Sequence, residues 1–405
     1  MFGYAEARQL ERRFLLVYIA LFFPYSIMTP FMQQLLHLYG YTPAQIGYIL
    51  GALELTAVLA PPVWGMLSDR QRAPRGVLLL TILLSIPTLR LIQPGLSTMP
   101  ALLAAIAFGF FNKPSIPLTD GVTFAAFRQT QAQYGRVRVG GTIAFVASML
   151  CCEFVFHVGD DATGKRIVLF LSGMLLIQAL SLALIPRTAN STSATPQATT
   201  TAFPWGMALR GGFPLFVLSA FLARFAMMSY YSFFSRYLNE VVGCTAIGYV
   251  WMLGPISEFP VIFWSGPIIS RIGLKRLFML ALAGTVLRLF GFALGSSLVV
   301  VLLLQPLHAL TFGAYHVAGV SWIGRLFPKE FQSTAQTIYS ALTTGLGGLL
   351  GSAFAGVIVQ HYGYTAMYLT CGCIALLAML LALPVSEVAT PLPPSTQTTK
   401  ARLCS

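Results

Sequence analysis

Charged side chains lie inside stretches that are otherwise apolar, and the first two are Asp120 and Arg138. Asp120 stands in "PLTDG" and Arg138 in "YGRVRVGG". An arginine guanidinium offers five donors in a planar fork, which suits a carboxylate or neighbouring hydroxyls. We therefore expect Asp120 and Arg138 to contact a small polar ligand. The alternative is a structural ion pair between two helices that no ligand touches. Arg136 is expected to be an interfacial anchor.

A second group lies in the later part of the chain. Glu258 stands in "GPISEFPVIF", Arg288 in "GTVLRLFG", and His308 and His316 in "LHALTFGAYHVAG". Ionisable groups inside apolar segments pair with one another or line proton and substrate pathways. Glu258, Arg288 and His308 each fall near the middle of an apolar segment, and so at similar depth in the membrane. A buried carboxyl with an arginine nearby can take up and release protons near neutral pH, so we predict a proton-coupling site at these three residues. The alternative for either histidine is a satisfied buried side chain. Arg224 could be a counter-ion for Glu258 or for an anionic substrate.

The same segments contain no signal for catalysis or for a bound metal. The cysteines in apolar runs behave as small hydrophobic residues, and no histidine or carboxylate stands at ligand spacing beside them. No nucleophile motif or phosphate-binding loop is present. We predict that the protein is not an enzyme and needs no cofactor or metal. Further charges inside apolar segments are Glu54, Arg90, Lys113 and Glu153.

Composition indicates which solvent surrounds these segments. Of 405 residues, 56% are hydrophobic and 9% are charged, and the mean hydropathy is +0.75. Soluble proteins carry about 25% charged residues. The bilayer must therefore be the solvent, and an all-α membrane protein is expected. The formal charge of +13 is spread over loops between apolar segments, which is typical of an orientation signal and argues against a nucleic-acid partner.

The elements that must position the charged groups are membrane helices. We predict twelve, at about residues 13–37, 43–66, 75–93, 98–127, 135–158, 165–186, 212–237, 244–269, 275–294, 297–325, 331–359 and 363–384. The bias of Lys and Arg toward alternate loops predicts that both termini are cytoplasmic.

The chain also divides into two similar halves. "GMLSDRQRAPR" at 65–75 is repeated in weaker form by "GPIISRIGLKR" at 266–276. We predict a six-helix half at 1–186, a Ser/Thr-rich cytoplasmic linker at 187–211, a second six-helix half at 212–385 and a disordered tail at 386–405. Two such pseudo-symmetric halves are typical of transporters, whose substrate site lies at their interface near the membrane centre.

The first repeat resembles the loop signature of the major facilitator superfamily. Gly65, Asp69, Arg70 and Arg75 match that signature, whereas Arg72 stands where the family has glycine. The resemblance implies a conformational latch that closes the inward face, because Asp69 near a helix end can pair in one state only. The alternative is a basic loop that acts only as a topology signal.

Within this superfamily the chain resembles two branches, the phenylpropionate permeases and the oligosaccharide:proton symporters that include lactose permease. The resemblance implies that Asp120 and Arg138 grip the substrate. It places Phe145 where the symporters have a tryptophan that stacks on the sugar. It further implies that Arg288 and His308 belong to a proton relay with Glu258, which stands where phenylpropionate-type relatives carry their glutamate.

The expected function is secondary active transport by alternating access in the cell inner membrane. We expect proton symport of a small organic solute, either an aromatic or other carboxylate or a sugar-like molecule, by a monomer. One alternative is a proton antiporter that exports a drug or metabolite. An alternative of another class is a membrane nutrient sensor that does not transport.

Overall fold

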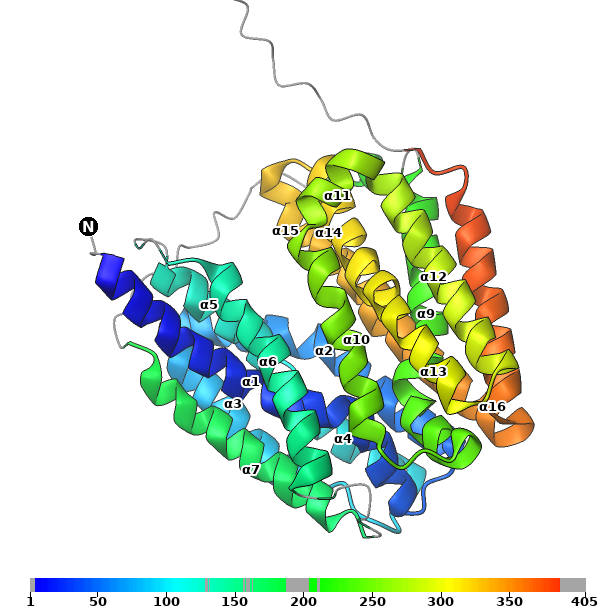
Figure 1. The fold of residues 1–405 in the computed structure, drawn as a ribbon. Helices are drawn as coiled ribbons and strands as arrows, with labels where there is room; N and C mark the ends of the chain where they lie inside the picture. The colour runs from blue at the N-terminus through cyan, green and yellow to red at the C-terminus, as the bar shows by residue number, and fades with distance from the viewer. Residues whose placement is uncertain are drawn as a thin grey trace, which may run out of the picture.

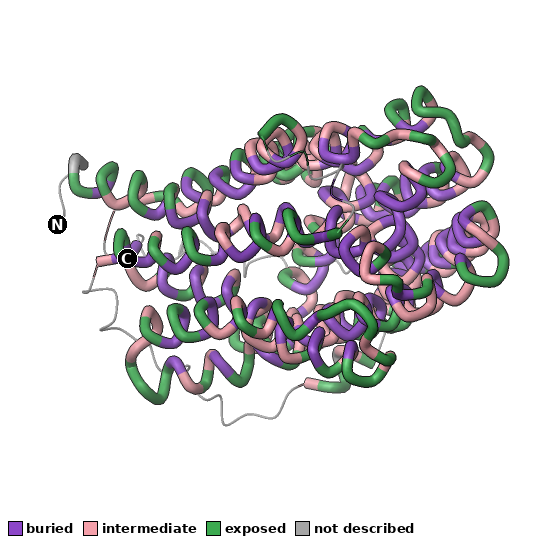
Figure 2. Tube along the Cα trace, turned by 90° about the horizontal axis from the view of Figure 1, so that it is seen from below, coloured by how far each residue is buried: buried purple, intermediate pink, exposed green. Residues whose placement is uncertain are grey.

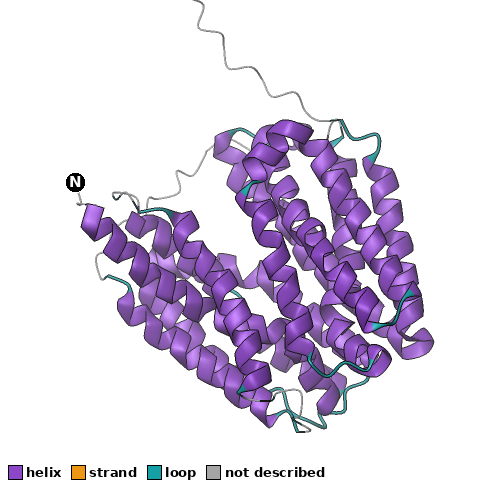
Figure 3. Cartoon of the chain, in the orientation of Figure 1, coloured by secondary structure: helices purple, strands orange, loops and turns teal. Residues whose placement is uncertain are grey.

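A computed structural model describes residues 4–127, 130, 132–155, 157, 161, 163–186, 204–209 and 212–386. Helices dominate these residues (Figure 3). Most of the predicted linker 187–211 and all of the predicted tail 386–405 except Ser386 lie outside the described residues.

The helices of the described residues form two bundles (Figure 1). The N-terminal bundle contains α1 (Tyr4–Leu38), α2 (Pro43–Gln71), α3 (Pro74–Leu89), α4 (Thr98–Asn112), α5 (Ser115–Phe127), α6 (Tyr134–Phe154) and α7 (Lys165–Ser181). The short α8 (Trp205–Ala208) leads to the second bundle. The C-terminal bundle contains α9 (Phe213–Tyr237), α10 (Ile247–Phe263), α11 (Ser265–Ile272), α12 (Leu274–Leu294), α13 (Leu298–Leu304), α14 (Tyr315–Leu326), α15 (Lys329–Ser340) and α16 (Gly347–Ala382).

Nine helical stretches in the described part of the chain are long and apolar enough to cross a membrane. The pair α10 and α11, bent by 64° at its break, makes a tenth if it is one span. The difference from the twelve predicted spans lies in two places. The α3 helix has 16 residues, fewer than the about 20 that a span needs. The stretch Glu330–Ala382 covers two predicted spans without a break in helix assignment. The count of twelve therefore stays a prediction.

Gly363 marks the boundary between those two merged spans. Its φ of 79° and ψ of −179° are not helical, and they are accessible to glycine at little cost. The predicted boundary between 359 and 363 coincides with this interruption.

The end of α2 forms a tight turn without the glycine that the signature has there. Arg72 follows the helix in the left-handed conformation, with φ 51° and ψ 30°. Its backbone N–H donates to the carbonyl oxygens of Asp69 and Ser68, so the last turn of the helix is capped. A left-handed arginine costs about 1–2 kcal/mol relative to an ordinary conformation. The turn therefore survives the replacement of glycine at this position.

The two bundles approach each other at the end remote from the chain termini (Figure 1). There the Gly248 N–H of α10 donates to the Glu153 carboxylate of α6 over 2.5 Å. Gln33 of α1 accepts from the Ser235 N–H of α9 over 3.1 Å. At the end of the chain termini the bundles are apart (Figure 1), and Gly65, near that end of α2, has nothing within 4 Å of where its Cβ would be. The bundles are thus joined at one end and apart at the other.

A close cross-bundle approach is the glycine seam, formed by Gly47 and Gly51 of α2 and Gly356 of α16. A Cβ on Gly47 would meet the Ser352 carbonyl oxygen and lie 3.0 Å from the Gly356 Cα. A Cβ on Gly51 would lie 2.6 Å from the Leu349 carbonyl oxygen. Small residues allow this backbone-to-backbone packing, as in membrane helix pairs generally.

Apolar side chains cover much of the outside of the molecule. Exposed positions run along the outward sides of peripheral helices, while buried ones face neighbouring helices (Figure 2). Leu103, Leu169 and Leu303 are 59%, 71% and 73% exposed. An apolar exterior of this kind is what a surrounding bilayer would cover.

Candidate functional site

Asp120 and Arg138 have separate partners in the N-terminal bundle. The Asp120 carboxylate, on α5, accepts hydrogen bonds from the Tyr18 hydroxyl and, over 3.0 Å, from the Tyr134 hydroxyl. The Arg138 guanidinium, on α6, lies 4.2 Å from the centroid of the Phe22 ring. Within the described residues the two side chains form no ion pair with each other. The structural ion pair that the sequence offered as an alternative is therefore absent from this conformation.

Phe145 lies on α6 two turns beyond Arg138. It is partly buried and packs against the main apolar core. Nearby on the same helix, the Ser148 hydroxyl is hydrogen-bonded to the Ser26 hydroxyl of α1. These contacts fix the helix that carries both Arg138 and Phe145 against α1.

The predicted proton-coupling residues come together in the C-terminal bundle. Arg288, on α12, is fully buried. It donates to His308 Nδ1 over 3.0 Å, to Thr311 Oγ1 over 3.1 Å and to Gln305 Oε1 over 2.5 Å. His308 Nε2 in turn lies 3.7 Å from Glu258 Oε2. The histidine thus contacts both the arginine and the carboxylate.

The geometry fixes which ring nitrogen of neutral His308 carries the proton. A guanidinium has only donors, so Nδ1 beside Arg288 must be the acceptor. The proton of a neutral ring is then on Nε2, which faces Glu258. The Glu258 Oε2 atom is buried and has no hydrogen bond. A movement of less than 1 Å would bring it within hydrogen-bond distance of the imidazole N–H.

Two neighbours that the sequence interpretation missed hold this cluster in place. The Arg288 guanidinium lies 3.9 Å from the centroid of the Tyr230 ring. The Gln305 side chain donates to the Val250 carbonyl of α10 over 2.6 Å. Gln305 stands three residues before His308 in an apolar run, so helical spacing could have placed both on one face. Nothing in the sequence indicated Tyr230.

His316 belongs to a ring stack and forms no ion pair that the described residues reveal. Its ring lies 6.1 Å from Phe312 and almost parallel to it, and Phe312 is stacked in the same way on His308 at 5.6 Å. His316 is thus linked to the cluster through an aromatic ring.

Arg138 connects the two bundles electrostatically. No hydrogen bond or ion pair among the described residues joins it to Glu258 or to His316, and it acts on both only through longer-range electrostatics between the bundles. The arginine assigned to the substrate and the carboxyl assigned to the proton therefore share one region of the molecule.

A third charged cluster links the bundles directly. The Glu54 carboxylate of α2 lies 3.1 Å from Lys113 Nζ, at the end of α4, and 3.5 Å from Arg224 Nη2 of α9. Arg224, which the sequence suggested as a counter-ion for Glu258 or a substrate, is thus paired with Glu54. The sequence marked Glu54 and Lys113 only as charges in apolar segments.

These three charges line a cavity of about 220 Å³ between the bundles. Apolar side chains, among them Met28, Met32, Met228 and Phe312, make up much of the remaining wall, and hydroxyl-bearing residues such as Thr29 and Ser232 also line it. The cavity combines a few charged groups with an apolar surface, which is typical of sites for small organic molecules.

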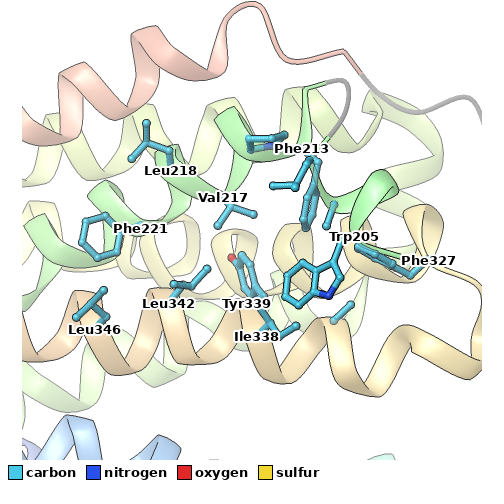
Figure 4. A pocket seen from close by; sticks show the side chains of 14 residues that line it. Trp205, Phe213, Val217, Leu218, Phe221, Phe327, Ile338, Tyr339, Leu342 and Leu346 are labelled. Atoms are coloured by element: carbon cyan, nitrogen blue, oxygen red, sulfur yellow. The ribbon is translucent and has the colours of Figure 1, made fainter. Parts of the chain in front are cut away.

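A larger pocket of about 400 Å³ lies between α8, α9 and α15 (Figure 4). Trp205, Phe213, Phe327 and Tyr339 are among the side chains around it. None of the described residues that line this pocket is charged. It contains none of the site residues predicted from the sequence.

The predicted latch residues lie at the end where the bundles are apart. Asp69 and Arg70 are exposed, and Asp69 has no ion-pair partner among the described residues. Arg75 donates to the Ile185 carbonyl just after α7, over 3.1 Å. Through Arg75 the loop is therefore tied to its own bundle.

Comparison with known proteins identifies transporters. The chain is 28% identical to the probable 3-phenylpropionic acid transporter of Escherichia coli (strain K12) over 389 residues, which covers 92% of this chain and 97% of the relative. It is 24% identical to the maltose permease of Geobacillus stearothermophilus, covering 91% of this chain and 93% of the relative.

Solved structures give the same fold. The nucleoside transporter NupG superposes with a TM-score of 0.77 at 16% sequence identity, covering 92% of this chain and 98% of that one. The two relatives and NupG are membrane transporters and not enzymes, which agrees with the sequence prediction. Residues 12–370 match the model of the MFS_1 like family. This match confirms the resemblance to the major facilitator superfamily that the loop signature indicated. The chain therefore belongs to the MFS_1 like family and is a multi-pass membrane transporter of the major facilitator superfamily.

Proposed function

We propose that this transporter is a secondary active symporter that moves a small organic solute together with protons by alternating access. It acts as a monomer in the cell inner membrane, with both termini in the cytoplasm and two six-helix halves, 1–186 and 212–385. The observation that carries the proposal is the contact of Glu258 with His308, which is itself bonded to Arg288.

The arrangement suggests how proton binding and bundle movement are linked. A buried carboxylate without a hydrogen bond is costly inside a membrane, and either a proton or a nearby cation removes that cost. Arg138 on the other bundle is such a cation. With a proton, Glu258 is neutral and the bundles are free to separate. Without it, the negative charge favours approach of Arg138. Proton occupancy therefore biases the distance between the bundles.

The substrate assignment rests on Asp120, Arg138 and Phe145 with the names of the relatives. Those names specify a carboxylate, 3-phenylpropionic acid, and a sugar, maltose. The Arg138 guanidinium, which stacks on a phenyl ring, could bind a carboxylate or neighbouring hydroxyls. The Asp120 carboxylate, which already accepts from two tyrosine hydroxyls, could accept from sugar hydroxyls in the same way. We propose a carboxylate or sugar-like solute on this basis.

Uptake into right-side-out vesicles with an imposed pH gradient tests the function. We expect labelled 3-phenylpropionate or maltose to accumulate when the outside is acidic, and a protonophore to abolish the accumulation. Extrusion driven by inward proton flow would instead support the antiporter. Absence of flux for every solute in either direction would support the sensor.

Asp69→Asn should slow transport without weakening substrate binding. The exposed carboxylate can pair only when the bundles meet at its end, so its loss changes the populations of the states and leaves the binding site intact. The measurement is the rate of counterflow beside the affinity of the purified protein. A normal transport rate would reduce this loop to a topology signal.

Arg138→Lys should weaken substrate binding by about 1.5–3 kcal/mol, the contribution of a charged hydrogen bond. Lysine keeps the charge but loses both the planar fork and the stacking on Phe22. The affinity of the folded variant is measured beside its melting temperature. Normal affinity with a lowered melting temperature would mean that Arg138 only supports the fold.

A further inference from the structure

We propose that Lys113, Arg224 and Tyr231 form a binding site for the carboxylate of a small organic monoanion, and that Glu54 occupies this site when it is empty. The proposal rests on the proposed transport function, and it narrows the substrate to an amphipathic anion. The site lies in the cavity between the bundles and adjoins the cluster around Glu258, because the Tyr231 ring lies 6.3 Å from the His308 ring.

Charge is the first observation. One carboxylate, Glu54, faces two cations, Lys113 and Arg224, and the three side chains are only 14–19% exposed. The cluster therefore has one surplus positive charge in a region of low dielectric. Unbalanced charge is costly inside a membrane protein. A ligand with a single negative charge would make the cluster neutral.

Unused hydrogen-bond capacity is the second observation. The Arg224 Nε atom is buried and has no partner, and its Nη2 contact with Glu54 is long, at 3.5 Å. The Tyr231 hydroxyl is also buried without a partner. The Arg224 guanidinium lies 5.0 Å from the Tyr231 ring, and both residues line the cavity. Buried donors without partners indicate a missing acceptor.

The backbone holds Lys113 in place for such a role. The helical path breaks between α4 and α5 at Lys113 and Pro114. The Tyr25 hydroxyl donates to the carbonyl oxygens of Asn112 and Lys113, over 3.0 and 3.4 Å, which satisfies acceptors freed by the break. The lysine is thus presented to the cavity from a fixed point.

The rest of the cavity indicates the body of the ligand. Its volume is about 220 Å³, and three methionines and Phe312 supply apolar surface. Methionine side chains adapt to irregular apolar shapes. The proposed occupant is therefore a carboxylate with a compact aromatic or aliphatic body that covers this apolar surface.

The position of the two cations gives the site a mechanical role. Lys113 belongs to the N-terminal bundle and Arg224 to the C-terminal bundle. An anion held by both joins the bundles at this depth and is released when they separate here. Glu54 reaches the same two cations, so it stands in for the anion during the return of the empty transporter.

Affinity measurements on purified full-length protein test the site. The probes are 3-phenylpropionate and its uncharged analogue 3-phenylpropanamide. Glu54→Gln removes the internal competitor, so we expect it to bind 3-phenylpropionate at least about tenfold more tightly. Arg224→Gln and Lys113→Gln should each bind it at least about tenfold more weakly. The amide should bind none of the proteins measurably.

Arg90→Gln is the matched control, because it removes an exposed cation at the end of α3. Its affinity should equal that of the wild type. A gain of affinity in Glu54→Gln cannot arise from misfolding. This variant can therefore still confirm or contradict the site if the Arg224 and Lys113 variants are unstable.

Three outcomes would overturn the site. They are unchanged affinity in the cation variants, weaker binding in Glu54→Gln, or no binding of 3-phenylpropionate to either the wild type or Glu54→Gln. Proton coupling is judged separately, from accumulation in vesicles. A protein that binds the carboxylate as described but does not accumulate solute would retain this site and lose the proposed symport.

Discussion

Glu258→Gln is expected to abolish accumulation of substrate against its gradient while counterflow of substrate down its own gradient continues. Glutamine has nearly the same shape and cannot release a proton, so it fixes the neutral state of the contact with His308. The neutral glutamine no longer attracts Arg138. The distance between the bundles then no longer depends on proton binding. Accumulation and counterflow are measured in the same vesicle preparation.

Glu330→Gln provides the control for this change. Glu330 is an exposed carboxyl in the first turn of α15, away from the cluster. It should accumulate substrate normally. If Glu258→Gln also accumulates substrate, the coupling group must be sought elsewhere, and the His308 contact would be structural.

Gly47→Leu is expected to slow transport by hindering the bundles from meeting at the end remote from the termini. A Cβ at this position already meets the Ser352 carbonyl oxygen and the Gly356 Cα. A leucine must push α2 away from α16, and overpacking of this kind costs about 1–3 kcal/mol. That free energy is enough to shift a population of states by roughly 5- to 150-fold. Spin labels on the two helices would report the separation.

Gly173→Leu is the control for the glycine change. Gly173 lies on α7, with nothing within 4 Å of where its Cβ would be. This variant should transport normally and keep the wild-type separation of α2 and α16. A Gly47→Leu variant that transports normally would show that the glycine seam does not need to close in the transport cycle.

The length of the apolar stretches predicted most helices, because every spanning segment must satisfy its own backbone and face lipid. It did not predict the places where a helix is interrupted without a polar loop. The break at Lys113 and Pro114 lies inside the predicted span 98–127, and the bend near Trp264 lies inside 244–269. Neither break exposes backbone to a polar segment, so hydropathy does not reveal it.

The candidate site was predictable only within each helix. Spacing along the chain placed Glu258, Arg288 and His308 at similar depths, and the structure has them in contact through His308. The pairing of Arg224 with Glu54 joins residues from different bundles. Depth alone cannot select between two carboxylates at similar levels, because rotation of each helix decides the partner.

The glycine seam also bears on the speed of the cycle. Where large side chains interdigitate, they gain rotamer freedom when two helices separate and lose it when the helices meet again. This loss of conformational entropy costs up to about 2 kcal/mol for a long side chain. Gly47, Gly51 and Gly356 have no rotamers to reset. The two helices contact each other through backbone atoms at these glycines. They can therefore separate and meet again with little entropic cost and without rearranging side chains. A low barrier of this kind would leave turnover limited by binding steps, and not by the closing of the end remote from the termini.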